Sequence, residues 1–492
     1  MASSLGPQTI AIAFDAGEAT LVRRLMASGD MPVLAGLAAR GGSAHVTSSA
    51  HIGSGSVWPT FASGTDLGEH GIHYIWRWEP AQMRLAREHG DSIVPWWRPL
   101  AQDGRRVLTL DVPYLPFADA DGCVEVFEWG SHDRRLGSVQ TRPVALAGEL
   151  ARDPGPHPFQ YEAPPPHDHP TQRQLAAVSA RASAGARLRG ELAARMIGEQ
   201  QPDLAFVVFS EIHHTSHLLW QTVAPDDPLF ERRGGNGLDE RALVDVFGAA
   251  DEAVGRIVEA ACPDARVAVF SLHGMRAAGG IPTLLHPLLV RLGYATAPRP
   301  GRMSPRDAAR TAFAAAKAHA PEWARSAWRR SASLTLLNAV AGPTAMKAYD
   351  WDRTRAFTLP HDQHGWVRIN LAGREARGTV PGAHYAGTCD ELSAALQAAR
   401  TQDGRRIVRR VIGVAEETGG PPPAHLPDLV VHWDDAAYDE PVHVAGTDIV
   451  ARPDALRLTG KHTFEGFLVS GGMAPPGETV ASHELHRLIA GR

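Results

Sequence analysis

The sequence contains little cysteine, no long apolar run and no excess of positive charge. Its three cysteines, Cys123, Cys262 and Cys389, form no Cys-x-x-Cys pair, so neither a disulfide framework nor a thiolate zinc site is expected. The formal net charge is -5 and there is no polybasic tail. We therefore expect neither polymeric nucleic acid nor an anionic membrane surface as a partner.

Segments that direct a chain to or through a membrane are also missing. The residues before the apolar stretch 9–14 have neither the positive flank nor the long apolar run of a signal peptide. No segment approaches the roughly 20 consecutive apolar residues of a membrane span. We expect a soluble, cytoplasmic protein, and the abundance of alanine, arginine, glycine and proline is typical of a GC-rich bacterial genome.

The composition is that of a globular protein, with 44% hydrophobic and 21% charged residues over 492 positions. Several short apolar runs end in polar residues and predict buried strands of a mostly parallel sheet: 10–15, 204–210, 266–271 and 429–432. Helical patterns lie between them, at 18–40, 176–199 and 239–261. This order predicts a layered α/β fold with helices on both faces of the sheet and ligands at the carboxyl ends of the strands.

Two stretches interrupt the alternation of strands and helices and indicate insertions. Residues 153–170 are rich in proline and histidine, and residues 298–345 are rich in alanine and arginine, with Trp323 and Trp328 at helical spacing. The second stretch is either a cap over the site or a solvated helix whose tryptophans pack on the core. We expect one catalytic domain over residues 1–492, with a cap or insertion region at 276–425.

Candidate metal ligands follow the first two predicted strands. Asp15 ends the first strand, where a carboxylate is either a helix cap or a metal ligand. His213 and His217 follow the strand at 204–210 and share one face of a helix, with room for one metal ion between them. The alternative for each histidine is a capping or core role.

Two further histidines are expected near the same edge of the sheet. His273 comes directly after the strand at 266–271, and His462 lies in a loop that leads into a later strand. Several imidazoles together with one carboxylate favour zinc over magnesium or calcium, whose ligands are mainly oxygen atoms.

A candidate nucleophile lies in the glycine- and serine-rich segment 53–64. The small residues that flank Ser54 would let a tetrahedral phosphoryl group approach the backbone, and a following helix would direct N–H groups at its oxygens. A tight turn with no catalytic role is the alternative.

Taken together, these segments resemble the alkaline phosphatase superfamily, and in particular its type I phosphodiesterase and nucleotide pyrophosphatase group. Counting back from His70-Gly71-Ile72 places the family's Thr or Ser nucleophile at Ser54, with Ser56 as the fallback. The other similar stretches are 13–17 and 31–41 (opening strand, metal-binding aspartate and helix), 58–64 and 70–72 (nucleophile segment), 211–220 and 271–274 (metal ligands) and 365–375 (leading to the last ligand).

The resemblance implies a hydrolase that cleaves a phosphodiester or a nucleotide-type pyrophosphate through a covalent phosphoserine. It implies two divalent metal ions, usually zinc, and a small anionic phosphoryl substrate. The family's ligand positions correspond here to His213, His217 and His462 for one ion and to Asp15, Ser54 and His273 for the other. The leaving group and the oligomeric state are not indicated.

The sequence departs from the family pattern at two positions that commonly hold aspartate. They are His213, which can still ligate, and Leu272, which cannot. The second ion then needs water, substrate or Glu211 to complete its ligands, or has been lost. The site also has two fewer carboxylates, which leaves a phosphomonoesterase or a non-catalytic metal- or ligand-binding relative as alternatives. A sulfatase is disfavoured because Ser54 is not in a Cys/Ser-x-Pro-x-Arg setting.

Overall fold

The computed structural model describes residues 7–131, 138–159, 171–232, 237, 239–298, 312, 316, 320, 346–360, 363–421, 423–436, 438, 440–451 and 458–491. The chain forms two compact units. The first comprises Met1–Asp66, His89–Ala277 and Arg457–Arg492, and the second comprises Leu67–Glu88 and Ala278–Leu456. Most of the stretch 298–345, with Trp323 and Trp328, lies outside the described residues, as does 160–170.

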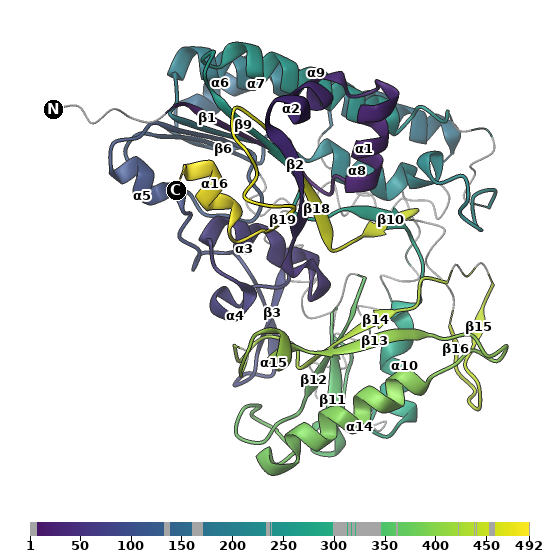
Figure 1. Ribbon diagram of the computed structural model, residues 1–492. Coiled ribbons are helices and arrows are strands. Elements are labelled where there is room, and N and C mark those ends of the chain that lie inside the picture. Colours follow the sequence, from purple (N-terminus) through teal and green to yellow (C-terminus); the bar gives the residue numbers. More distant parts are fainter. Residues whose placement is uncertain are drawn as a thin grey trace. The chain divides into compact units, whose positions relative to one another are not determined.

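The first unit is built around a nine-stranded sheet with the order β19-β2-β18-β9-β1-β8-β5-β6-β7 (Figure 1). Parallel pairing joins β1 to β8 and β9, β5 to β6 and β8, and β19 to β2, whereas β18 and β7 run antiparallel to their neighbours. The mostly parallel α/β fold is thereby confirmed. The strands are β1 Thr9–Phe14, β2 Gly42–Thr47, β5 Val107–Leu110, β6 Cys123–Phe127, β7 Gln140–Arg142, β8 Leu204–Phe209, β9 Arg266–Phe270, β18 Glu465–Gly471 and β19 Thr479–Ala481.

Helices cover both faces of this sheet, with α7 and α9 on one side and α5 and α16 on the other (Figure 1). The helices α7 and α9 cross closely at Gly190, where an added Cβ would lie 2.5 Å from that of Ala253. The helices of this unit are α1 Ala19–Ser28, α2 Pro32–Gly41, α3 Val57–Ser63, α5 Trp97–Gln102, α6 Leu146–Arg152, α7 Gln172–Gln200, α8 Glu211–Leu219, α9 Val244–Ala260 and α16 Leu485–Ala490, with the short 3-10 turns η1 Ser49–His51, η2 Ser54–Ser56 and η3 Trp220–Val223.

The single helix predicted over 18–40 is in fact two helices. Gly29 ends α1 in the left-handed conformation, with φ 85°, and its N–H faces the carbonyls of Leu25 and Met26. Pro32 then begins α2, because its fixed φ suits the first turn of a helix and its missing N–H is not needed there. The apolar periodicity continues across this break, which is why the pattern alone did not reveal it.

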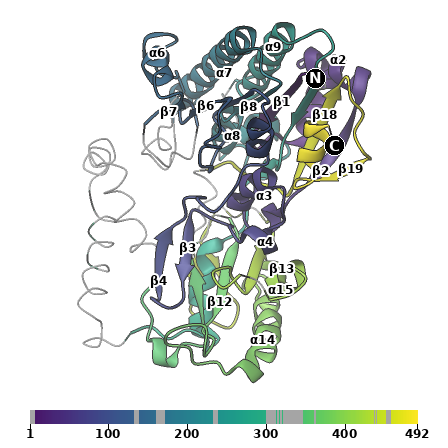
Figure 2. The same cartoon turned by 90° about the vertical axis from the view of Figure 1, so that its left-hand side faces the viewer.

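The second unit has its own antiparallel sheet in the order β11-β12-β14-β13, whose four strands are labelled in Figure 1. Helix α14 packs against β13 (Figure 2). The prediction that 429–432 belongs to the parallel sheet was therefore wrong, because this run is β14. The strands of the antiparallel sheet are β11 Ala356–Leu359, β12 Gly365–Ile369, β13 Val408–Gly413 and β14 Leu429–Trp433. Two further pairs of strands form two-stranded sheets of their own: β3 Trp76–Glu79 with β4 Arg84–Arg87, and β15 Val442–His443 with β16 Val450–Ala451. The helices are α4 Leu67–His70, α10 Leu285–Arg291, α14 Tyr385–Ala398 and α15 Val414–Glu417, with η4 Pro282–Leu284, η5 Trp351–Arg353 and η6 Gly382–His384.

Within the described residues, no helix combines the length and the apolar character that crossing a lipid bilayer requires. The cap or insertion region at 276–425 remains a prediction.

The carboxyl group of Glu125 is buried in the first unit, on strand β6. It accepts hydrogen bonds from the Ala118 N–H at 3.1 and 3.0 Å, but its burial raises the pKa to about 7. The folded protein therefore retains this proton at a pH where the unfolded chain has already lost it.

Because the folded state binds the additional proton, stability should fall as the pH rises from about 4.5 to about 7. The shift corresponds to about 3 kcal/mol over that window. We expect Glu125→Gln to flatten this part of the stability profile, since the amide oxygen can still accept from Ala118. Urea unfolding at several pH values measures this. Glu199→Gln, which changes an exposed carboxylate on α7, is the control, and an unchanged slope in Glu125→Gln would contradict the assignment.

Candidate active site

The topology of the sheet brings the predicted site residues to one edge. Phe14 of β1 pairs with Phe209 of β8, and Ala13 pairs with Phe270 of β9, so the three strands end at one level. Asp15 comes directly after β1, α8 begins two residues after β8, and His273 lies three residues after β9.

The two remaining candidates reach the same edge through antiparallel strands. The start of β18 lies beside the end of β2, with Glu465 opposite Thr47. His462 ends the short strand β17 (Gly460–His462), which precedes β18 and pairs with β10 (Met275–Ala277). Ser54 follows β2 and is the first residue of η2, which continues directly into α3. The hydroxyl of Ser48 donates to the Phe464 carbonyl at 3.2 Å and joins the two loops.

Three imidazoles converge at this edge. The Nε2 atom of His213 lies 3.1 Å from Nε2 of His217 and 2.8 Å from Nε2 of His462. His213 and His462 are buried, and His217 is half-buried. A tetrahedral zinc ion with Zn–N distances near 2.0–2.1 Å separates its ligand nitrogens by about 3.3 Å, so these spacings are close to those of a ligand set.

The hydrogen bonds on the other side of two rings determine their tautomers. The Nδ1–H of His213 donates to Asp15 Oδ2 at 2.9 Å, and that of His217 donates to the Gly460 carbonyl at 2.8 Å. In the neutral rings both Nε2 atoms therefore carry lone pairs, although they face each other. Only a shared proton or a cation satisfies that arrangement. These residues consequently fit a divalent metal ion.

A second possible ligand group consists of Asp15, His213 and His273. The His273 Nε2 lies 3.6 Å from Asp15 Oδ1, and the indole N–H of Trp58 donates to the same oxygen at 3.3 Å. Trp58 belongs to α3, one turn after Ser54, and so ties the predicted nucleophile segment to Asp15. This group depends on His213, whose Nε2 already faces the other two histidines.

The two candidate nucleophiles differ in their surroundings. Ser56 is fully buried; its hydroxyl donates to the Gly53 carbonyl at 2.7 Å and lies 2.6 Å from the Ser49 hydroxyl. Thr60 extends this hydroxyl network, with its Oγ1 2.9 Å from Ser49 Oγ. Ser54 is half-buried. The geometry therefore favours Ser54 over Ser56, although its role remains a prediction.

The Glu211 carboxylate, considered from sequence as an additional metal ligand, has other partners. Arg189 Nε donates to its Oε1 at 2.9 Å, and His157 Nε2 lies 2.8 Å from the same atom. Burial alone would raise the pKa of Glu211, but the charge of the Arg189 guanidinium, together with the contact to His157, more than offsets this and holds the pKa below its usual value. The carboxylate is thus an ion-pair partner at the first residue of α8.

Sequence reasoning missed Arg189, which holds this network together. It is fully buried in the middle of α7 and also donates to Asp111 Oδ2 at 2.6 Å and to the Gly130 carbonyl at 3.2 Å. Because Glu211 begins the helix that carries His213 and His217, Arg189 anchors the ligand-bearing helix to α7. A lone arginine in a long helix resembles a surface residue, and no sequence signal identifies it.

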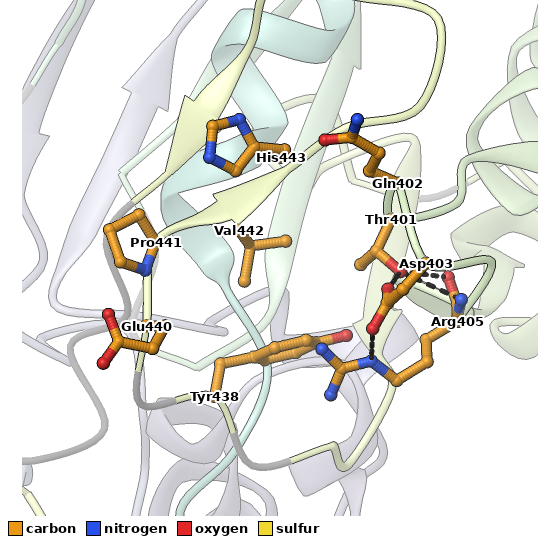
Figure 3. Close-up of a pocket in the computed structure, with 9 residues that line it drawn as sticks. All are labelled: Thr401, Gln402, Asp403, Arg405, Tyr438, Glu440, Pro441, Val442 and His443. Atoms are coloured by element: carbon orange, nitrogen blue, oxygen red, sulfur yellow. Dashed lines mark hydrogen bonds and ion pairs between the residues drawn. The ribbon is translucent and has the colours of Figure 1, made fainter.

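The second unit contains a separate pocket of about 340 Å³ (Figure 3). Two of its charged side chains pair with each other. Arg405 pairs with Asp403 at 2.7 Å, and its guanidinium lies over the Tyr438 ring at 4.8 Å. The possible metal-ligand groups found among the described residues include none from this pocket.

Comparison with known proteins gives one family. Residues 9–438 match the model of the family described as type I phosphodiesterase / nucleotide pyrophosphatase. Since the match covers most of the sequence, the chain belongs to this family, which lies in the alkaline phosphatase superfamily. The expected class of enzyme, a hydrolase acting on phosphoric ester bonds, is thereby confirmed.

Two solved structures of one enzyme show the same fold at low sequence identity. Phosphonoacetate hydrolase from Sinorhizobium meliloti 1021 in complex with phosphonoacetate superposes with a TM-score of 0.55 at 13% identity, over 99% of this chain and 96% of the other. The complex with phosphonoformate gives a TM-score of 0.54 at the same identity and coverage. An inactive form of murine ectonucleotide pyrophosphatase / phosphodiesterase 5 in complex with AMP gives 0.46 at 10% identity, over 99% and 95%. No curated protein sequence matches this chain significantly.

The buried ion-pair network predicts a large effect of removing its cation. Arg189→Met would leave Glu211 and Asp111 buried without their partner, so we expect a loss of about 3–5 kcal/mol in the free energy of unfolding, measured by urea denaturation. Arg187→Met, on the same helix, breaks only the exposed pair with Glu252 and should stay within about 0.5 kcal/mol of the wild type. Equal losses in the two variants would refute the role of Arg189.

Proposed function

We propose that this chain hydrolyses a small phosphodiester or nucleotide-type pyrophosphate through a phospho-Ser54 intermediate, with zinc held by His213, His217 and His462. The observation that carries the proposal is the convergence of three imidazole Nε2 atoms on one edge of the sheet. The loop between β2 and η2 leads to Ser54 from the same edge.

The chain's residues divide the reaction between them. The Ser54 hydroxyl releases its proton to water, its oxygen attacks phosphorus, a Ser54 O–P bond forms, and the P–O bond to the leaving group breaks, with the leaving oxygen protonated from water. Water then attacks the phosphoserine, releases the phosphoryl product and restores the hydroxyl. A bound zinc ion would supply Lewis acidity that lowers the pKa of a hydroxyl and offsets the phosphoryl charge. Asp15 and the Gly460 carbonyl hold two of the imidazoles in the ligating tautomer.

The substrate is expected to be a small phosphoryl anion, because a zinc ion on three neutral imidazoles, with Asp15 as the only carboxylate among the predicted ligands, leaves the site positive. A screen of bis-p-nitrophenyl phosphate, p-nitrophenyl phosphate and p-nitrophenyl sulfate separates a diesterase from a monoesterase and a sulfatase. Phosphonoacetate belongs in the same screen, since the superposed Sinorhizobium enzyme is a hydrolase of that compound. Turnover of none of the four by the zinc-loaded protein would favour a non-catalytic relative.

Removing the proposed nucleophile should abolish turnover. We expect Ser54→Ala to lower kcat by at least about a thousandfold while preserving the fold and the bound metal, because only the attacking oxygen is lost. Ser56→Ala is the matched control: it removes hydroxyl contacts to Gly53 and Ser49 and should lower stability by about 1 kcal/mol while retaining activity. If Ser56→Ala were inactive and Ser54→Ala active, the nucleophile would be Ser56 and the assignment of Ser54 would be wrong.

Loss of either histidine should weaken metal binding. His217→Ala and His462→Ala each remove a nitrogen that ligates the metal. Loss of a residue that only hydrogen-bonds to a ligand lowers metal affinity about 10- to 100-fold, so we expect zinc affinity to fall further than this in both variants. Elemental analysis after dialysis and calorimetric titration measure this. His45→Ala, which changes an exposed histidine on β2, should leave binding unchanged. Unaltered metal content in both site variants would make these histidines structural.

A further inference from the structure

The carboxylate of Asp15 is occupied by N–H donors on both of its oxygens. His213 Nδ1–H is directed at Oδ2, and the indole N–H of Trp58 is directed at Oδ1. An indole nitrogen can donate but cannot ligate a metal ion. Asp15, the residue at the family's position for a ligand of the second ion, is therefore oriented here as an acceptor for side chains.

The ring of His213 links Asp15 to the three-histidine set. With Nδ1–H donated to Asp15, only Nε2 has a lone pair, and this atom faces His217 and His462. For the group Asp15, His213 and His273 to hold an ion as well, the ring would have to lose both protons and bridge two metals. A hydrogen-bonded, neutral imidazole satisfies the same contacts without that requirement.

The ligands left for a second ion are weaker donors than the three imidazoles of the first. Leu272, at the position of the family's aspartate, is buried and has no donor atom. Glu211 is paired with Arg189. Asp15, His273 and Ser54 remain, and the carboxylate among them already accepts from Trp58 and His213. A second ion would therefore have one charged ligand, Asp15, which is shared with two N–H donors, so the residues present favour one ion over two.

The charge balance of the site supports the same stoichiometry. Two dications facing the three carboxylates of the family pattern leave one positive charge, and one dication facing Asp15 alone leaves the same charge. Loss of the carboxylates at positions 213 and 272 together with one ion therefore keeps the attraction for an anionic phosphoryl group.

From these contacts we infer that this chain holds a single divalent ion on His213, His217 and His462, and that Asp15 is a positioning residue that fixes the ligating tautomer of His213. The inference rests on the metal site of the proposed function but is independent of the reaction catalysed.

Metal stoichiometry tests the inference directly. The full chain is stripped with a chelator and titrated with Zn2+ by calorimetry, with elemental analysis of the dialysed product and the visible absorption of bound Co2+ as a measure of ligand geometry. We expect one ion per chain. Two ions per chain would overturn the inference, whether the second is held by Asp15 and His273 or through a bridging imidazolate. No bound ion would overturn both the inference and the proposed metal site.

The role of Asp15 is tested by Asp15→Asn, which preserves shape. The amide can donate to Nδ1 of His213 and thereby place the ring proton on Nε2, so we expect the stoichiometry to stay at one while affinity falls about 10- to 100-fold. Asp251→Asn is the control, because Asp251 is equally buried and accepts from Val33 and Leu34 N–H groups away from the site. It should lower stability without changing zinc affinity. Unchanged affinity in Asp15→Asn, or an equal fall in the control, would refute positioning by Asp15.

Restoring the family's two aspartates provides the converse test. The double variant His213→Asp/Leu272→Asp should bind two ions per chain, since Asp15 would lose its histidine partner and regain a neighbouring carboxylate. If the folded double variant bound only one ion per chain, the absence of the second ion could not be assigned to positions 213 and 272. If the wild type binds one ion but hydrolyses none of the phosphoryl esters, the inference stands and the proposed function fails.

Discussion

The parallel pairing of β1 with β8 and β9 is the constraint on which the site depends. The residues paired with Thr9 are Leu204 and Arg266, which lie 195 and 257 positions later in the sequence, yet the register makes Phe14, Phe209 and Phe270 end at nearly the same level. A shift of one residue in either pairing would move the following loop along the strand axis by about 3.3 Å, which is about the separation of two ligand nitrogens on one tetrahedral zinc ion. The buried apolar residues of the three strands therefore determine the geometry of the imidazoles indirectly.

The parts of the fold that follow from local patterns could be predicted from the sequence. The apolar runs at β1, β8 and β9 are buried strands, and the polar residues after them meet at the expected edge. The run at β14 looks the same but belongs to an antiparallel sheet, because a strand buried on both faces reads as apolar in either setting. A short stretch of sequence shows that a strand is buried, but it does not show which strands pair with it.

The site shows the same division between local and distant information. Spacing and resemblance predicted the three histidines and Asp15 as ligands, and the structure brings these residues together. The hydrogen bond between Asp15 and His213 could not be predicted, because it joins residues 198 positions apart and neither sequence segment indicates it. Arg189 is a stronger example. Its burial follows from two carboxylates contributed by other elements, and a helical arginine is ordinarily exposed. A buried charge of this kind can be predicted only when its ion-pair partners in the fold are known.

At position 213, where the resemblance implies aspartate, the histidine makes contacts that an aspartate could not make. The two oxygens of a carboxylate share one carbon and can only accept, whereas the imidazole presents a donor on one side of the ring and an acceptor on the other. His213 thus receives its orientation from Asp15 through Nδ1 and directs Nε2 toward His217 and His462. One side chain thus joins Asp15 and the other two histidines into a single hydrogen-bonded unit. In the single-ion site that we propose, position 272 needs no ligand, and a buried leucine fits there without leaving a charge unpaired.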